Sequence, residues 1–217
     1  MDKSVVNERI ERTGMIPVIR AESSDEAARV VEAIAEGGVD VFEVTMTVPG
    51  AVDLISKLAQ RFGEEALVGA GTVMDPESAN RCIDAGARFV ISPSFDPATV
   101  AACVERGVTV MPGALTPTEI VTAWGAGADF VKVFPAGAVG GAGYIKNILG
   151  PLPHVKLIPT GGVSATNAAD FIRAGAKAVG VGTELVDLKA IRQGNSNIIT
   201  ETARRFLAIV KEARQDQ

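Results

Sequence analysis

A glycine recurs in this chain wherever a helical pattern of apolar residues gives way to a run of β-branched residues. It occupies positions 38, 86, 107, 127 and 175, and Ala or Val follows it each time. Glycine readily adopts the left-handed conformation that ends a helix. The intervals are 48, 21, 20 and 48 residues. They predict a helix–strand repeat of about 24 residues, because each long interval holds one further strand pattern.

Eight such repeats fill the chain. We predict strands at residues 15–20, 39–45, 66–70, 88–91, 108–111, 129–134, 156–159 and 176–181. A Ser-Asp start predicts a helix over Ser24–Glu36, because both residue types cap helix N-termini. A last helix is expected over about 198–214, and a short helix is expected before the first strand.

The alternation of strands and helices is typical of α/β proteins, and a Rossmann-like open sheet would also alternate in this way. Eight near-equal units without a leftover segment favour a single (β/α)₈ TIM barrel over residues 1–217, with a short N-terminal helix. In such barrels the active site lies at the carboxyl ends of the strands. Those ends are therefore where we look for functional side chains.

Composition excludes several classes of protein. The hydrophobic fraction is 47%, the charged fraction is 22% and the net charge is −5, without a basic stripe, so we expect neither disorder nor nucleic-acid binding. Two cysteines and one histidine do not form a disulfide framework or a recognisable metal-ligand pattern. No apolar run approaches about 18 residues and the first residues are charged, which argues against a membrane span or signal peptide. We expect a cytoplasmic protein without a metal or cofactor.

Two charged residues interrupt the apolar strand patterns. Glu43 lies in the second predicted strand and Lys132 in the sixth, each five residues after the preceding glycine. Equal rank in opposite strands predicts that both side chains point into the barrel at one level. A desolvated lysine has a lowered pKa and becomes a nucleophile toward carbonyls, and a facing carboxylate can move protons. The pair indicates Schiff-base chemistry, with a structural buried ion pair as the alternative.

Glycine-rich segments follow the last two predicted strands. Thr160-Gly161-Gly162 follows the seventh strand, and Gly182-Thr183 follows the eighth. Loops at these strands form the usual phosphate site of such barrels. Small residues let backbone N–H groups approach an anion closely. We therefore predict a phosphate site here, although glycine also serves tight turns that bind nothing.

The chain carries a series of short motifs at the predicted strand ends. They are Glu43-Val-Thr, Val68-Gly-Ala-Gly71-Thr72-Val, Ile91-Ser-Pro93, Met111-Pro-Gly113, Lys132-Val-Phe134-Pro and Pro159-Thr-Gly-Gly162. From about residue 16 to residue 186, in order and spacing, the sequence resembles the 2-keto-3-deoxy-6-phosphogluconate (KDPG) / 4-hydroxy-2-oxoglutarate (KHG) aldolase family.

The resemblance implies a metal-free class I aldolase on a (β/α)₈ barrel, assembled as a homotrimer. It implies cleavage of KDPG to pyruvate and glyceraldehyde 3-phosphate, a step of the Entner–Doudoroff route. For many members it also implies cleavage of KHG to pyruvate and glyoxylate.

The resemblance also assigns roles to particular residues. Lys132 is similar to the Schiff-base lysine of the family and Glu43 to its general acid/base. The remaining matches are substrate-binding positions: Thr72, Pro93, Phe134 and Thr160 for pyruvate, and Gly161, Gly162, Thr183 and the adjacent Gly182 for phosphate.

One position departs from the family pattern. Many members carry an arginine, thought to grip the substrate carboxylate, where this chain has Thr47. Arg20, near the end of the first predicted strand, is our candidate replacement, since an arginine fork binds carboxylates strongly. A rim arginine paired with Glu43 or Glu22 is the alternative.

Other functions stay open at this point. The galactonate-derived epimer of KDPG is an alternative main substrate. Another phosphosugar isomerase, epimerase or synthase would use Glu43 as a base and Lys132 only as a charge. A barrel that binds a phosphorylated ligand without turnover is a third class. Fold likeness alone does not decide among them.

Overall fold

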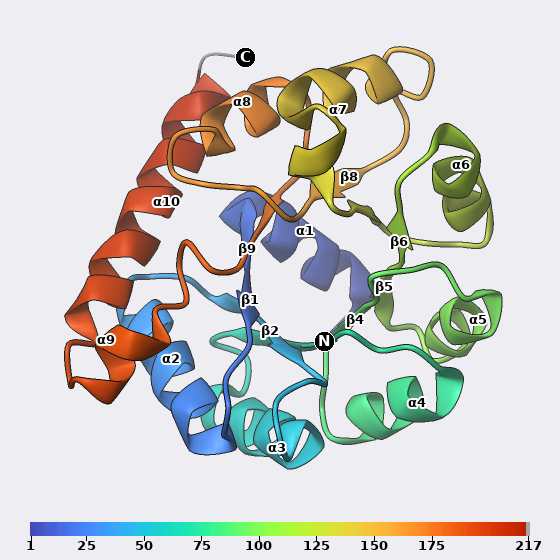
Figure 1. The fold of residues 1–217 in the computed structure, drawn as a ribbon. Coiled ribbons are helices and arrows are strands. Elements are labelled where there is room, and N and C mark those ends of the chain that lie inside the picture. Colours follow the sequence, from blue (N-terminus) through green and yellow to red (C-terminus); the bar gives the residue numbers. More distant parts are fainter. Residues whose placement is uncertain (216–217) are drawn as a thin grey trace.

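The computed structural model describes residues 1–215. Strands gather at the centre of the molecule and most helices surround them (Figure 1). The strands are β1 (Met15–Ile19), β2 (Val41–Thr45), β3 (Leu67–Gly71), β4 (Phe89–Ile91), β5 (Thr109–Met111), β6 (Gly113–Ala114), β7 (Val131–Val133), β8 (Leu157–Pro159) and β9 (Val179–Val181). This is a parallel α/β fold.

The helices alternate with the strands along the chain. They are α1 (Lys3–Thr13), α2 (Ser24–Glu36), α3 (Ala51–Phe62), α4 (Pro76–Asp84), α5 (Pro97–Glu105), α6 (Pro117–Gly125), the 3₁₀ helix η1 (Ala136–Val139), α7 (Gly141–Leu149), α8 (Ala168–Arg173), α9 (Leu188–Arg192) and α10 (Asn197–Gln215). Between residues 1 and 215, no helix is both long and apolar enough to cross a bilayer.

The helix predictions are confirmed closely. Helix α2 has the predicted bounds, α10 extends one residue beyond each predicted end, and α1 is the short N-terminal helix. The five recurring glycines all have positive φ, between 64° and 103°. At Gly38, the residue that follows donates to the carbonyl of Ile34, and Gly38 itself donates to Ala35. This paired bonding defines the Schellman helix end, and the same two bonds recur at the other four glycines.

The strands pair in two parallel sheets within the described residues. One sheet has the order β5-β4-β3-β2-β1-β9, and the other has the order β6-β7-β8. The two sheets adjoin each other at both edges. Pro112 alone separates β5 from β6, and on the other side Thr160 forms a parallel bridge with Gly180. Lys177 N–H also donates to the Leu157 carbonyl at 3.0 Å there.

The fifth predicted strand needs a correction. The prediction placed one strand at residues 108–111 among eight, whereas over residues 1–215 the structure has nine, with β6 as the extra one. Pro112 lacks an N–H group and therefore interrupts the hydrogen-bond ladder. The chain continues past it, because the Pro112 carbonyl accepts a 2.9 Å bond from Lys132 N–H.

Predicted strands also begin too early, by up to three residues at β9. The residues directly after each glycine complete the helix end rather than a sheet ladder. Val39, for example, uses its N–H on Ile34, and β2 begins only at Val41.

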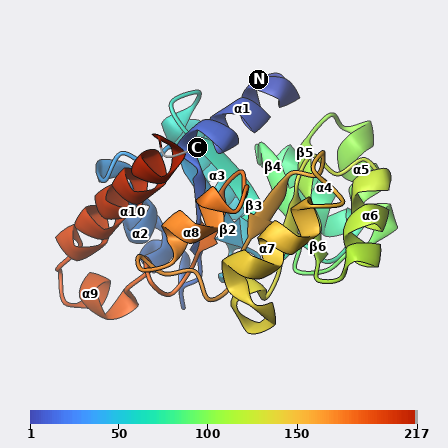
Figure 2. The ribbon, with the colours of Figure 1, turned by 90° about the horizontal axis from the view of Figure 1, so that it is seen from above.

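Apolar side chains form two clusters. The larger cluster lies between the strands and the surrounding helices. The smaller lies inside the ring of strands and receives Val6 and Ile10 from α1, packed with strand residues such as Ile16, Phe89 and Ile158. Helix α1 therefore covers one end of the strands, as the turned view shows (Figure 2).

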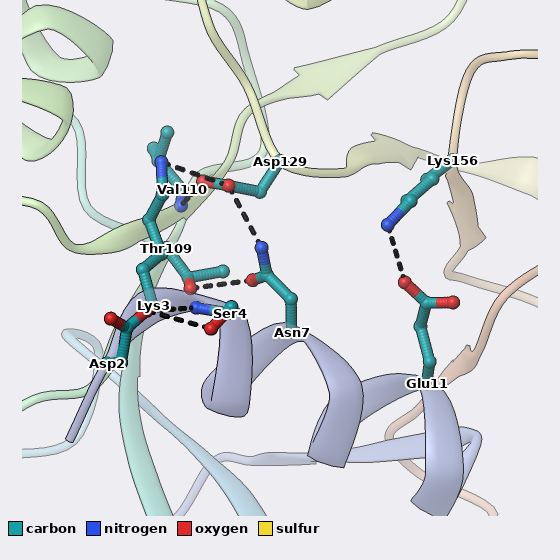
Figure 3. A network of polar contacts seen from close by, with 9 residues as sticks. All are labelled: Asp2, Lys3, Ser4, Asn7, Glu11, Thr109, Val110, Asp129 and Lys156. Atoms are coloured by element: carbon teal, nitrogen blue, oxygen red, sulfur yellow. Dashed lines mark hydrogen bonds and ion pairs between the residues drawn. The ribbon is translucent and has the colours of Figure 1, made fainter.

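A polar network fixes α1 at that end (Figure 3). Asn7 donates to Asp129 at 3.0 Å and accepts from the Thr109 hydroxyl at 2.7 Å. Lys156 pairs with Glu11 at 2.7 Å. The partners of α1 precede or begin their strands, so α1 lies at the amino ends. The carboxyl ends, at the opposite side, stay open for a site.

The covering role of α1 can be tested by stability. Ile10→Ala should lower the free energy of unfolding by about 2–5 kcal/mol, because it removes a fully buried side chain and leaves a cavity. Urea denaturation measures this. Val5→Ala is the matched control on the same helix, since Val5 is 43% exposed; it should change stability by less than about 0.5 kcal/mol. Equal losses in both variants would contradict the packing of α1 described here.

Candidate active site

Lys132 and Glu43 meet in the interior, as predicted. Lys132 comes from β7 in one sheet and Glu43 from β2 in the other. Their Nζ and Oε1 atoms are 3.6 Å apart, and their side chains are only 4% and 2% exposed. Isolated charges at such depth are costly, so each stabilises the other.

The pair does not satisfy itself completely. Glu43 Oε1 is buried and makes no hydrogen bond with any of residues 1–215. A buried acceptor without a donor is rare and calls for an explanation. The free acceptor beside the lysine amine is the arrangement expected where a substrate group completes the bonding.

Gly71 provides the space for the Glu43 carboxylate. It ends β3, next to β2 in the sheet, and Gly71 pairs with Thr45 in the register. A Cβ atom at Gly71 would overlap the carboxylate of Glu43. Sequence reasoning did not single out this role; the signal was the small-residue run Val-Gly-Ala-Gly in a strand, which marks a close approach.

Phe134 links the lysine to the glycine-rich loop. Lys132 Nζ lies 5.6 Å from the centre of the Phe134 ring, within the range of a cation–π contact. The same ring packs under Gly161, where an added Cβ would lie 3.2 Å from it. The adjoining Thr160 is buried and donates its N–H to Val133 at 2.9 Å.

The two predicted phosphate loops are ordered turns. Gly161 and Gly162 have φ of 84° and 77°, a region that favours glycine. Gly161 accepts a 2.9 Å bond from Gly137 N–H. In the other loop, Gly182 accepts from two following residues, which forms a turn after β9. Across residues 1–215, the N–H groups of Gly162 and Thr183 have no partner, so both are available to an anion.

Thr72 and Pro93 lie at the carboxyl ends of β3 and β4. Thr72 has φ of 58°, and of the non-glycine residues that the structure describes it alone has a positive φ. Such a conformation costs about 1–3 kcal/mol, and residues that adopt it cluster at functional sites. The backbone of Pro93 occupies the space that a side chain at Gly113 would need.

Arg20 follows β1 and is exposed. It makes no ion pair or hydrogen bond with the part of the chain described here. The alternative that it pairs with Glu43 or Glu22 is therefore wrong. Glu43 faces Lys132, and Glu22 pairs with Arg192 at 2.8 Å.

The Thr47 hydroxyl forms a hydrogen bond at the end of β2. It bonds the hydroxyl of Thr45 at 2.7 Å, and Thr45 donates to the Ile19 carbonyl at 2.9 Å. The position thus supports the end of β1, directly before Arg20.

Other reactive side chains lie outside the site. Burial raises the pKa of the Cys82 thiol to about 11 and that of Cys103 to about 12, so both remain neutral thiols near neutral pH. The exposed His154 packs edge-on against Trp124 with ring centres 6.2 Å apart. In the described part of the chain, no three His, Cys, Asp or Glu side chains gather as metal ligands.

Comparison with known proteins shows which family the chain belongs to. The family model described as KDPG and KHG aldolase matches residues 6–202. The chain belongs to this family.

Individual relatives span nearly the whole chain. The KHG/KDPG aldolase of Escherichia coli is 36% identical over 198 residues, 91% of this chain and 92% of the relative. The 2-dehydro-3-deoxy-6-phosphogalactonate aldolase of the same organism is 34% identical over 202 residues, 93% and 95% of the two chains.

A solved structure of another KDPG aldolase contains a covalent intermediate formed with pyruvate. The KDPG aldolase of Legionella pneumophila, with pyruvate captured at low pH as a covalent carbinolamine intermediate, superposes with a TM-score of 0.84 at 33% identity. The match covers 91% of this chain and 96% of the other.

The space beside Glu43 can be tested in this family member. Gly71→Ala should displace the carboxylate and lower kcat for aldol cleavage by about 100-fold or more, because small misplacements of reacting groups have such effects. Gly125→Ala is the control, since nothing lies within 4 Å of a Cβ there. Steady-state kinetics and thermal melts of both variants give the answer. Full activity in folded Gly71→Ala would show that Glu43 does not need this position.

Proposed function

We propose that the protein is a class I aldolase that cleaves KDPG to pyruvate and glyceraldehyde 3-phosphate, and that also cleaves KHG to pyruvate and glyoxylate. The observation that carries this proposal is the buried ion pair of Lys132 Nζ with Glu43 Oε1 at 3.6 Å, an oxygen that accepts no hydrogen bond from the described residues. An amine and a proton carrier enclosed together are what Schiff-base cleavage requires.

The proposed reaction begins when the amine nitrogen of Lys132 adds to the C2 ketone of the substrate. Loss of water gives an iminium, which is an electron sink. Glu43 then accepts the proton of the C4 hydroxyl, directly or through water, and the C3–C4 bond breaks. The products of this step are the free aldehyde and an enamine on Lys132. Protonation of the enamine at C3 and addition of water release pyruvate and the lysine.

The loops are proposed to hold the two ends of the substrate. The unpaired N–H groups of Gly162 and Thr183, with Gly161 and Gly182, would bind the phosphate. Thr72, Pro93, Phe134 and Thr160 would line the pyruvate pocket, a role supported by the contact of Phe134 with Lys132. Binding energy from the remote phosphate then orients the reacting carbons.

The galactonate-derived epimer is a second candidate for the main substrate. A relative that carries this activity in its name is as similar as the gluconate-type relatives, at 34% identity. The two substrates differ in configuration at one carbon, and both carry the ketone and the phosphate that Lys132 and the loops are proposed to bind. Comparison of kcat/KM for KDPG, its galactonate epimer and KHG decides among them.

Finer features of the fold and assembly also belong to the proposal. Contacts on both borders of the two sheets support a closed eight-stranded barrel, with β5 and β6 as one interrupted strand. The predicted single domain runs over residues 1–217, of which 216 and 217 lie outside the described residues. Assembly as a homotrimer, a place in the Entner–Doudoroff route, a cytoplasmic location and activity without a metal or cofactor stay predictions from the sequence.

The roles of the central pair are separated by trapping with pyruvate and borohydride. Lys132→Ala should abolish both cleavage and the irreversible gain in mass, because the imine nitrogen is gone. Glu43→Gln should still trap some pyruvate but lose about 10²- to 10⁴-fold in kcat, the usual contribution of a positioned acid/base. Peptide mass mapping locates the modified lysine. Trapping at another lysine in Lys132→Ala would contradict the assignment of Lys132 as the Schiff-base lysine.

Arg20 is proposed to bind the substrate carboxylate. Arg20→Ala should raise KM for pyruvate-type substrates by about 10- to 150-fold, since a lost charge-assisted hydrogen bond costs about 1.5–3 kcal/mol. Arg20→Lys should restore only part of this, because a lysine lacks the planar fork. Arg61→Ala, an exposed arginine on α3 paired with Glu32, is the control. Unchanged KM in Arg20→Ala would leave the carboxylate to backbone N–H groups and the Thr72 hydroxyl.

A further inference from the structure

Arg192 joins two parts of the molecule that are remote in sequence. It ends α9 and reaches the start of α2, where its Nε lies 2.6 Å from Glu26 Oε1 and its Nη2 lies 3.3 Å from Glu26 Oε2. The same Nη2 is 2.8 Å from Glu22 Oε2. This forked contact fixes the orientation of a guanidinium far better than a single bond does.

Glu26 is the centre of this cluster. Its side chain is 11% exposed, and it also accepts a 3.2 Å bond from the backbone N–H of Glu22. Hydrogen bonds from Arg192 hold its pKa below the ordinary value for glutamate. Surface ion pairs contribute little when both groups are mobile, but here the acceptor is largely buried and bound on two sides.

The cluster lies between two loops of the proposed substrate site. Glu22 follows Arg20 in the segment after β1, and α9 follows the Gly182-Thr183 turn after β9. Strands β1 and β9 are neighbours in the sheet, with Ile16 paired to Gly180. Arg192 therefore connects the segment that carries Arg20 to the chain that leaves the phosphate loop.

The segment around Arg20 is anchored on both sides. The Ile19 carbonyl before it accepts from Thr45, and Glu22 after it is bound to Glu26 and Arg192. Arg20 itself lies between these anchors and makes no contact with residues 1–215 by hydrogen bond or ion pair. The guanidinium of Arg20 is therefore free to take an anion, and the anchored backbone limits the ordering on binding to the side chain itself.

We propose that Arg192, acting through Glu22 and Glu26, is a positioning residue that holds Arg20 in register with the phosphate loop, so that the two anionic ends of the substrate are bound at a fixed separation. This inference rests on the proposed function, in which Arg20 takes the carboxylate. Arg192 touches no substrate in this scheme, and its effect is exerted on KM rather than on the chemistry at Lys132.

The test measures pyruvate binding in Arg192→Ala. The half-saturating pyruvate concentration for borohydride trapping at Lys132 and KM for KDPG should both rise by about 5- to 30-fold, the factor that corresponds to one or two kcal/mol. The kcat value should fall less than threefold. Arg192→Lys should recover only part of the loss, since an ammonium cannot bind Glu22 and Glu26 with a planar fork.

A double-mutant cycle shows whether Arg192 acts through Arg20. In the Arg20→Ala background, Arg192→Ala should raise KM no further, because the group that it positions is absent. The matched control is Arg204→Ala on α10, a similarly exposed arginine that pairs with the exposed Glu201. It should leave KM, kcat and trapping at the values of the unmodified protein.

Each result bears on one claim. Absence of trapping in the unmodified protein overturns the proposed function itself. Normal trapping, with unchanged KM in Arg192→Ala or with fully multiplicative effects in the double variant, overturns the positioning role alone. If Arg192→Ala melts too early for kinetics, Glu26→Gln removes the acceptor charge with little change of shape. It should raise KM in the same way, and unchanged KM in that variant would equally overturn the role.

Discussion

The burial of one lysine and one glutamate inside apolar strands is the constraint on which the rest of the structure depends. Each charge loses several kcal/mol of hydration when it leaves water, and their mutual attraction offsets this only in a fixed geometry. Lys132 and Glu43 stand too far apart to hold each other by a hydrogen bond. Their position is therefore set by the strands that carry them and by Gly71, which leaves the carboxylate its space.

The two ends of the strands serve different purposes. At the amino ends, α1 fills the interior with Val6 and Ile10 and satisfies the polar groups that begin the strands. At the carboxyl ends, the backbone is strained at Thr72 and turns on glycines at 161 and 162. Stabilising contacts are concentrated at the amino ends of the strands. The carboxyl ends can therefore keep N–H groups and a carboxylate oxygen that make no hydrogen bond.

Much of this arrangement was predictable because its signals are local. A glycine that follows a helical pattern, such as Gly38, indicates by its residue type that the helix ends there. The equal rank of Glu43 and Lys132 within the repeat predicts that their side chains meet. Proline at position 112 indicates an interruption of the strand. Its continuation as β6 was not predictable, because it depends on the hydrogen bond from Lys132 N–H to the Pro112 carbonyl. The Arg192 cluster had no sequence signal at all, because it joins residues separated by 166 positions, and the packing of α9 on α2 decides it.

The network beneath the strands has a consequence for the order in which the chain acquires its structure. Helix α1 leaves the ribosome before the strands that it contacts, since Asn7 bonds Asp129 122 residues later and Glu11 pairs with Lys156 145 residues later. Contacts at such separations carry a large loop-closure cost and form late. Although α1 is synthesised before these strands, it is therefore among the last elements to dock, and its apolar face with Ile10 must stay exposed to solvent or a chaperone until most of the strands have been made.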